Sequence, residues 1–113
     1  MFQKSLEIGY LLDFYGELLN NRRQTVLDMY YNEDMSLSEI AESLGITRQG
    51  VRELIKKSGD ELLNFEEKLG MAKKFRDLCK CADSAEKIIR EKTNDNFEEL
   101  LNILSEIRRI IEN

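Results

Sequence analysis

The chain of 113 residues contains no histidine and only two cysteines, Cys79 and Cys81. A zinc site would have to be assembled from carboxylates, and two cysteines placed two residues apart on a helix point in different directions. The sequence also lacks a glycine-rich phosphate loop and a group of carboxylates beside a nucleophile. We therefore expect no metal, no cofactor and no enzymatic activity, and we interpret both cysteines as reduced thiols.

Proline is absent as well, and no long apolar run is present. Without proline, the chain favours consecutive helices separated by polar or glycine-containing breaks, so the sequence predicts an all-α protein. No apolar segment approaches the length that spans a bilayer, and the first ten residues, MFQKSLEIGY, lack the features of a secretion signal. The expectation is a cytoplasmic protein with no membrane partner.

Acidic residues outnumber basic residues overall, but one segment carries an excess of basic residues. The formal net charge is −5, which argues against a protein that coats nucleic acid without sequence preference. Between Gly45 and Ser58, however, four basic residues stand against the single acid Glu53. A contact with nucleic acid is therefore expected in this segment, with modest affinity that falls steeply as salt is added.

The same segment lies in a helix-turn-helix pattern from Ser36 to Ile55, SLSEIAESLGITRQGVRELI. Such a motif needs a small residue where its helices cross, here Ala41, and a glycine in its turn, here Gly45. Ser36 and Glu39 form a capping box that starts the first motif helix at Leu37, and Thr47 can cap the second. The aliphatic residues expected between the helices are Ile40, Leu44, Ile46, Val51, Leu54 and Ile55.

The outward side of the second motif helix supplies the candidate contacts with double-stranded DNA. Positions 51, 54, 55 and 58 are expected to face the first motif helix, which leaves the basic residues and a glutamine on the open side. Arginine can pair with guanine, glutamine with adenine, and lysine with phosphates. The predicted DNA-binding residues are Thr47, Arg48, Gln49, Arg52, Lys56 and Lys57, with Arg22 and Arg23 as flanking phosphate contacts. The alternatives are a solvated surface or a protein-binding face.

Length favours a single domain over residues 1–113. Its expected parts are an N-terminal helix (1–20), a helix-turn-helix unit (21–58) and C-terminal helices (60–113). We expect helices near 4–19 and 22–31, candidate bends at Gly59 and Gly70, and breaks near Asp83–Ser84 and at 93–96. Whether Gly59 interrupts the second motif helix stays open at this point.

The last predicted helix has an apolar face wide enough to require a cover. Its heptad positions are Phe97, Leu100, Leu104, Ile107 and Ile111. Either a second chain or the preceding helices can cover this face, so the C-terminal helices form a dimer interface or a bundle. We favour a homodimer, because DNA-binding proteins of this kind gain affinity and half-site selection by pairing.

One resemblance is carried by the stretch RRQTVLDMYYNEDMSLSEIAESLGITRQGVRELIKK. It resembles region four of bacterial sigma factors, which reads promoter DNA while bound to RNA polymerase. The positions of that family's base and phosphate contacts are occupied by Arg48, Gln49 and Arg52, with Arg22 and Arg23 near its flanking contacts. Gly50 and Glu53 stand where promoter-reading members usually carry a long basic residue and a glutamine. The usual promoter element is therefore not the expected target.

A narrower resemblance covers residues 10–51, YLLDFYGELLNNRRQTVLDMYYNEDMSLSEIAESLGITRQGV, and continues through LLNFEEKL at 62–69. These residues resemble the YlxM-like proteins, small bacterial proteins with a region-four-like domain and additional helices at both ends. The resemblance implies a DNA-binding regulator associated, through gene neighbourhood, with the signal recognition particle pathway. The alternative is an adaptor that uses the same fold to bind RNA polymerase or a component of the targeting machinery.

Overall fold

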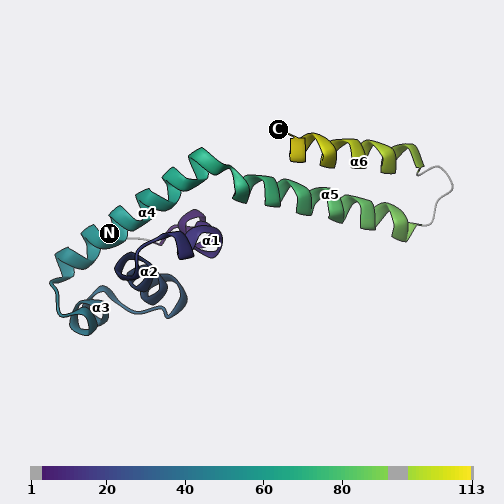
Figure 1. The fold of residues 1–113 in the computed structure, drawn as a ribbon. Helices are drawn as coiled ribbons and strands as arrows, with labels where there is room; N and C mark the ends of the chain where they lie inside the picture. The colour runs from purple at the N-terminus through teal and green to yellow at the C-terminus, as the bar shows by residue number, and fades with distance from the viewer. Residues whose placement is uncertain (1–3, 92–96, 113) are drawn as a thin grey trace. The chain divides into compact units, whose positions relative to one another are not determined.

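The computed structural model describes residues 4–91 and 97–112, and every element within these ranges is helical. The α-helices are α1 (Leu6–Tyr15), α2 (Asn21–Leu27), α3 (Leu37–Leu44), α4 (Arg48–Leu69), α5 (Met71–Glu91) and α6 (Phe97–Glu112) (Figure 1). The predicted all-α class is confirmed. No helix in these two ranges combines the length and the apolar character needed to cross a membrane.

The chain forms two compact units that divide at a glycine. The N-terminal unit comprises Met1–Leu69 and the C-terminal unit comprises Gly70–Asn113. Gly70 has a φ of 63°, a left-handed conformation that ends α4 and that glycine adopts without steric cost. Helix α4 runs from Arg48 to Leu69 without interruption, so Gly59 does not interrupt the second motif helix.

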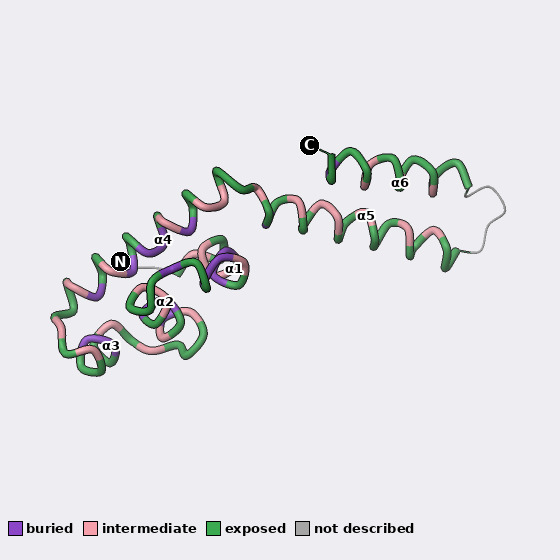
Figure 2. The backbone as a smooth tube through the Cα atoms, in the orientation of Figure 1, coloured by how far each residue is buried: buried purple, intermediate pink, exposed green. Residues whose placement is uncertain are grey.

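Helix α4 is the centre of the N-terminal unit, because α1, α2 and α3 all pack against it (Figure 2). The largest side chains that this packing buries completely are Leu11, Val26, Leu27, Ile40, Val51 and Leu62. Gly59 lies where α1 approaches α4, and a Cβ atom added there would be 3.4 Å from Cδ1 of Ile8. This is an ordinary van der Waals distance, so the site would also accept a methyl group, and the glycine does not bend α4.

Two α-helices of the N-terminal unit change to another helix type before the ends that the sequence predicts. Helix α1 stops at Tyr15 and is followed by a 3-10 turn over Gly16–Leu18. Helix α2 stops at Leu27, where the backbone widens into a π-helical turn over Asp28–Asn32. This turn directs two neighbouring tyrosines toward the protein: Tyr30 is buried, and the Tyr31 hydroxyl accepts a hydrogen bond of 3.3 Å from the backbone N–H of Ser5.

The C-terminal unit is a hairpin in which α5 and α6 pack antiparallel (Figure 1). Helix α5 continues through Asp83 and Ser84, so the break expected there is wrong. Both residues are exposed, and a helix tolerates short polar side chains that point into solvent. The break expected at residues 93–96 lies outside the described residues.

Candidate nucleic-acid interface

The turn between α3 and α4 has the geometry that the sequence predicts. Gly45 adopts φ 68° and ψ 34°, and its backbone N–H donates to the carbonyl oxygen of Ala41. This left-handed residue satisfies a carbonyl at the end of α3 and reverses the chain direction. Ala41 is buried at the crossing of the helices. The turn therefore fixes where α4 begins.

Both motif helices begin with the predicted caps. The Ser36 hydroxyl accepts a hydrogen bond of 3.1 Å from the Glu39 backbone N–H, and the Glu39 carboxylate accepts one of 3.1 Å from the Ser36 N–H. The Thr47 hydroxyl accepts a bond of 2.9 Å from the N–H of Gly50. Because each cap fixes the first helical residue, it also fixes which side chains of α4 point away from the unit.

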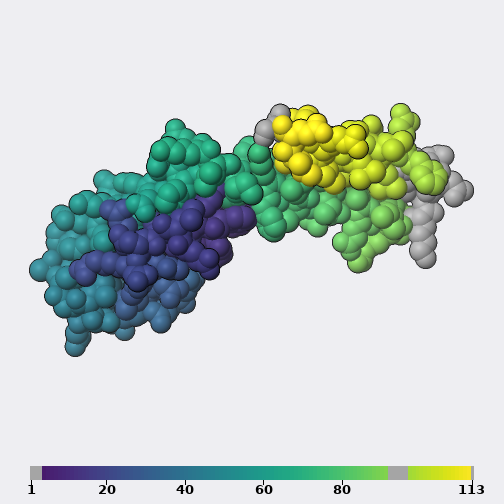
Figure 3. All heavy atoms as spheres, viewed as in Figure 1, coloured from purple at the N-terminus to yellow at the C-terminus, as the bar shows by residue number. Residues whose placement is uncertain are grey.

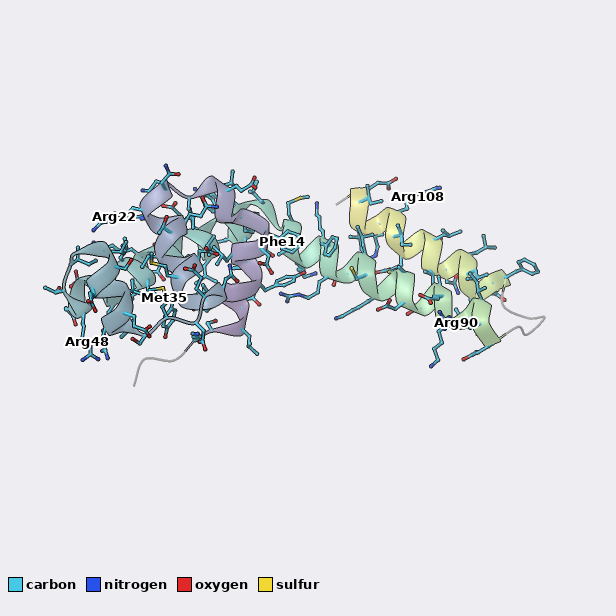
Figure 4. The ribbon with its side chains drawn as sticks, turned by 90° about the horizontal axis from the view of Figure 1, so that it is seen from below. Phe14, Arg22, Met35, Arg48, Arg90 and Arg108 are labelled. Carbon is cyan, nitrogen blue, oxygen red and sulfur yellow. The ribbon has the colours of Figure 1, made fainter. Side chains whose placement is uncertain are left out.

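The first turns of α4 place the candidate DNA contacts on one open side. Val51, Ile55 and Ser58 are buried against the unit. The exposed residues of the same segment are Arg48, Gln49, Arg52, Glu53, Lys56 and Lys57. Thr47, at the cap, is exposed too. Figure 4 shows the Arg48 side chain projecting outward from the N-terminal unit.

The N-terminus of α4 is favourable for an anion. Its first turn contains no acidic residue, and the helix dipole adds partial positive charge from the free N–H groups at the same end. Arg48 and Arg52 place full positive charges there, although cations oppose the dipole and cost helix stability. A backbone phosphate brought to this end would meet N–H donors and guanidinium groups together. Glu53 is the acidic exception on this side.

The two flanking arginines differ in their surroundings. Arg22 is exposed and projects outward from α2 (Figure 4). Arg23 forms an ion pair with Glu61 of α4, and its backbone N–H donates to the Asn20 side chain, which caps α2. The guanidinium of Arg23 therefore already has an internal carboxylate partner, whereas that of Arg22 projects into solvent.

Lys4 is a basic residue near this surface that the sequence analysis did not single out. Its ammonium group lies 5.0 Å from the centre of the Tyr30 ring and pairs with Asp34, which lowers the pKa of that carboxyl. Burial, and then the neighbouring Tyr31, raises the pKa of Tyr30, while Lys4 and Arg52 act in the opposite direction. Lys4 is far from Arg52 in sequence, and no local pattern connects them.

The residues predicted for self-association lie on α6 and fall into two groups. Phe97, Leu104 and Ile111 are exposed, at 79%, 60% and 64% of their surface. Leu100 and Ile107 are half-buried. The heptad positions therefore do not all lie on one equally accessible stripe.

Comparison with known proteins agrees with this geometry. A family model described as "UPF0122: Putative helix-turn-helix protein, YlxM / p13 like" matches residues 2–103. The chain belongs to the UPF0122 family. A UPF0122 protein of Thermoanaerobacter sp. strain X514 is 44% identical over 105 residues, covering 90% of this chain and 88% of the relative. One from Listeria innocua is 37% identical over 109 residues, covering 91% and 99%.

Membership of the UPF0122 family confirms the resemblance to YlxM-like proteins and extends it to most of the chain. A third UPF0122 protein, from Clostridium novyi, is 36% identical over 111 residues, with 94% of this chain and 93% of the relative covered. The UPF0122 description names a helix-turn-helix, which in this chain corresponds to α3, the turn at Gly45 and the start of α4. It describes no enzyme family.

Proposed function

We propose that this UPF0122 protein is a DNA-binding regulatory protein that places the first turns of α4 in the major groove. The supporting observation is the exposed row formed by Arg48, Gln49 and Arg52 at the capped start of a helix-turn-helix helix. The major groove admits an α-helix, and residues near the N-terminus of the second motif helix reach the base edges.

The chemistry of several of these residues allows a specific role on DNA. Arg48 and Gln49 occupy the first turn and are proposed to contact bases, because arginine and glutamine form paired hydrogen bonds with guanine and adenine. Lys56 lies two turns further along α4 and is assigned to phosphate. Arg22 is the flanking phosphate contact. Arg23 contributes less to DNA binding, because Glu61 already neutralises it.

The test is selection of bound duplexes from a random DNA pool, followed by anisotropy titration of the enriched sequence. In the double variant Arg48→Ala plus Gln49→Ala, affinity for that sequence should fall by about 100-fold, since each lost paired contact is worth roughly 1–3 kcal/mol. The matched control, Arg90→Ala plus Asn102→Ala, removes the same charge from exposed positions of the C-terminal unit. Absence of any enriched motif, or an equal loss in the control, would reject the proposal.

We further propose that two copies act together in the cytoplasm, where the bacterial chromosome lies. Pairing would let two motifs bind two half-sites, so the enriched DNA should contain a two-fold repeat. The resemblance to YlxM-like proteins adds the signal recognition particle pathway as the cellular setting. Titration with the purified particle would show whether that connection is a physical contact.

A second candidate function is a protein-binding adaptor that contacts RNA polymerase or the targeting machinery. The observation that favours it is a hollow of about 540 Å³ beside α1 and α2, whose lining includes Asp13, Glu17 and Asp28. Such a surface suits a basic protein segment and repels phosphate. Glu53, the exposed carboxylate on the open side of α4, favours the adaptor for the same reason, because a carboxylate repels phosphate. The substitution Glu53→Gln therefore separates the two functions. Tighter binding of the variant to every DNA sequence would identify Glu53 as a repulsive bystander.

A further inference from the structure

Helix α6 carries an exposed apolar stripe beside the side that packs on α5. Its large residues are Phe97, Leu101, Leu104 and Ile111, which expose between 60% and 79% of their surface. Their spacing of four, three and seven residues is that of a heptad, with Arg108 in the remaining position. The less exposed residues form a separate row, Leu100, Ile103, Ile107 and Ile110. Helix α6 therefore has two adjacent apolar rows.

Helix α5 repeats this arrangement. Its exposed row has the same spacing and contains Phe75, Cys79, Ala82 and Ile89, with Glu86 in the remaining position. Its less exposed row contains Leu78, Cys81, Ala85 and Ile88. Phe75 and Ile89 expose 53% and 64% of their surface. An apolar row that continues along both helices is more than scattered surface hydrophobicity.

The exposed rows of the two helices lie on the same side of the hairpin. In each helix the exposed row is rotated from the less exposed row by one residue step, about 100° in the same sense. Helices α5 and α6 run antiparallel and pack against each other. Since the less exposed row of each helix is the side covered by this packing, equal rotations bring both exposed rows to one face. We call this surface the hairpin face. Figure 3 shows the side chains of α6 along the surface of the C-terminal unit.

The hairpin face carries six large apolar side chains, and each exposes more than half of its surface. A contiguous apolar surface of this kind marks an interaction site. A face made of two antiparallel helices is also self-complementary, since two such faces form a four-helix bundle. The expected occupant is therefore a second copy of this chain.

The charges within the hairpin face favour one pairing. Stacking α5 on the partner's α5 would bring two copies of Glu86 to the same helix pair, and stacking α6 on α6 would do the same for Arg108. Stacking α5 on the partner's α6 avoids both like-charge pairs. In that arrangement the two-fold axis runs along the helices, and every helix is antiparallel to its neighbours.

We propose that two chains pair through the hairpin face into an antiparallel four-helix bundle, with α5 of each copy against α6 of the other. Leu100 and Ile107, which the sequence also assigned to the dimer interface, are half-buried members of the less exposed row and are not part of the hairpin face. This inference rests on the homodimer that is part of the proposed function, and it identifies the surface through which the two copies pair. It does not require that the protein bind DNA, so the test is made without DNA.

The test is the mass of the full chain in solution, measured by analytical ultracentrifugation over a wide range of concentration. The wild type should reach twice the chain mass of 13.3 kDa. The double variant Leu101→Glu plus Leu104→Glu should dissociate at least about 100-fold more readily, because it places charges on the buried side of the interface. The matched control is Asn102→Glu plus Ser105→Glu, which adds the same charges at the same spacing on another side of α6. It should remain a dimer.

A chemical readout covers the case in which the charged variant does not fold. Cys79 lies in the hairpin face and is exposed in the single chain, so dimerisation should slow its alkylation by iodoacetamide as protein concentration rises. The rate measured on wild type needs no variant. A wild type that stays monomeric with a constant Cys79 rate, a larger oligomer, or a dimer that survives in the charged variant would each overturn the proposal. Loss of DNA binding with an intact dimer would reject only the proposed function.

Discussion

Arg23 of α2 and Glu61 of α4 form an ion pair within the N-terminal unit. Their side chains are 29% and 30% exposed, so the pair is partly shielded from water. It joins α2 to the helix that carries the candidate DNA contacts. The preceding residue, Arg22, is exposed. Of these two adjacent arginines, Arg23 therefore has a structural role, and Arg22 is the one proposed to contact phosphate.

Replacing each arginine in turn should separate these roles. Arg23→Ala leaves Glu61 without its partner and should lower the free energy of unfolding by about 1 kcal/mol. Arg22→Ala should change stability by less than about 0.5 kcal/mol and should weaken DNA binding at every sequence, with a smaller salt dependence. Tyrosine fluorescence during urea unfolding measures the first effect, because all four tyrosines lie in the N-terminal unit. Equal effects of the two substitutions on stability would contradict this division.

The turn at Gly45 gives a prediction with its own internal control. A Cβ atom added at Gly45 would meet no atom within 4 Å, so only its left-handed φ of 68° disfavours a side chain. Gly45→Ala should therefore cost about 1 kcal/mol of stability. Gly45→Asn should cost less, because asparagine tolerates this conformation better than alanine. Urea unfolding of both variants, followed by tyrosine fluorescence, gives the comparison; equal costs would show that φ is not the cause.

The helix-turn-helix could be predicted from the sequence because its determinants are local. A capping box involves residues three apart, the left-handed turn needs one glycine, and the cap at Thr47 fixes the start of α4. The open side of α4 then follows from helical periodicity alone. These contacts form within a few residues, so their spacing in the sequence is sufficient evidence.

Other features depend on contacts between distant residues and could not be predicted. The pairing of Arg23 with Glu61 and the approach of Lys4 to Tyr30 join segments that only the tertiary fold brings together. Gly59 is a candidate bend in the sequence, but in the fold it lies within the continuous helix α4, beside Ile8 of α1. The division of the α6 heptad into an inner and an outer row likewise requires knowledge of how α5 packs on it.

Reversing the charge of Arg48 should affect stability and binding in opposite directions. Arg48 lies at the start of α4, where a cation opposes the helix dipole. Arg48→Glu should therefore stabilise the N-terminal unit by a few tenths of a kcal/mol, while it weakens DNA binding by at least about 100-fold. Unfolding and anisotropy titrations on the same preparation test both signs. A loss of stability as large as the loss of binding would indicate that Arg48 has a structural role.

Tyr30 should make the fold sensitive to alkali. Burial of the ring, and then Tyr31, raises the pKa of the Tyr30 hydroxyl above 10.0, although Lys4 and Arg52 oppose the shift. The folded chain therefore keeps this proton at a pH where the unfolded chain has begun to lose it. The stabilisation is fully present below pH 10 and is lost as the pH rises through the folded pKa. As the pH rises above 10, the free energy of unfolding of the wild type should therefore decrease relative to that of the Tyr30→Phe variant.

The measurement is urea unfolding of both proteins, followed by circular dichroism, at neutral pH and at several values above pH 10. Tyr10→Phe is the control for the loss of a tyrosine ring hydroxyl. Tyrosinate absorbance provides a second observation, because the component missing from the Tyr30→Phe titration should be the one that ionises at the raised pH. If the stabilities of wild type and Tyr30→Phe run parallel across the range, burial of Tyr30 does not couple its ionisation to folding, since linkage requires different proton affinities in the two states.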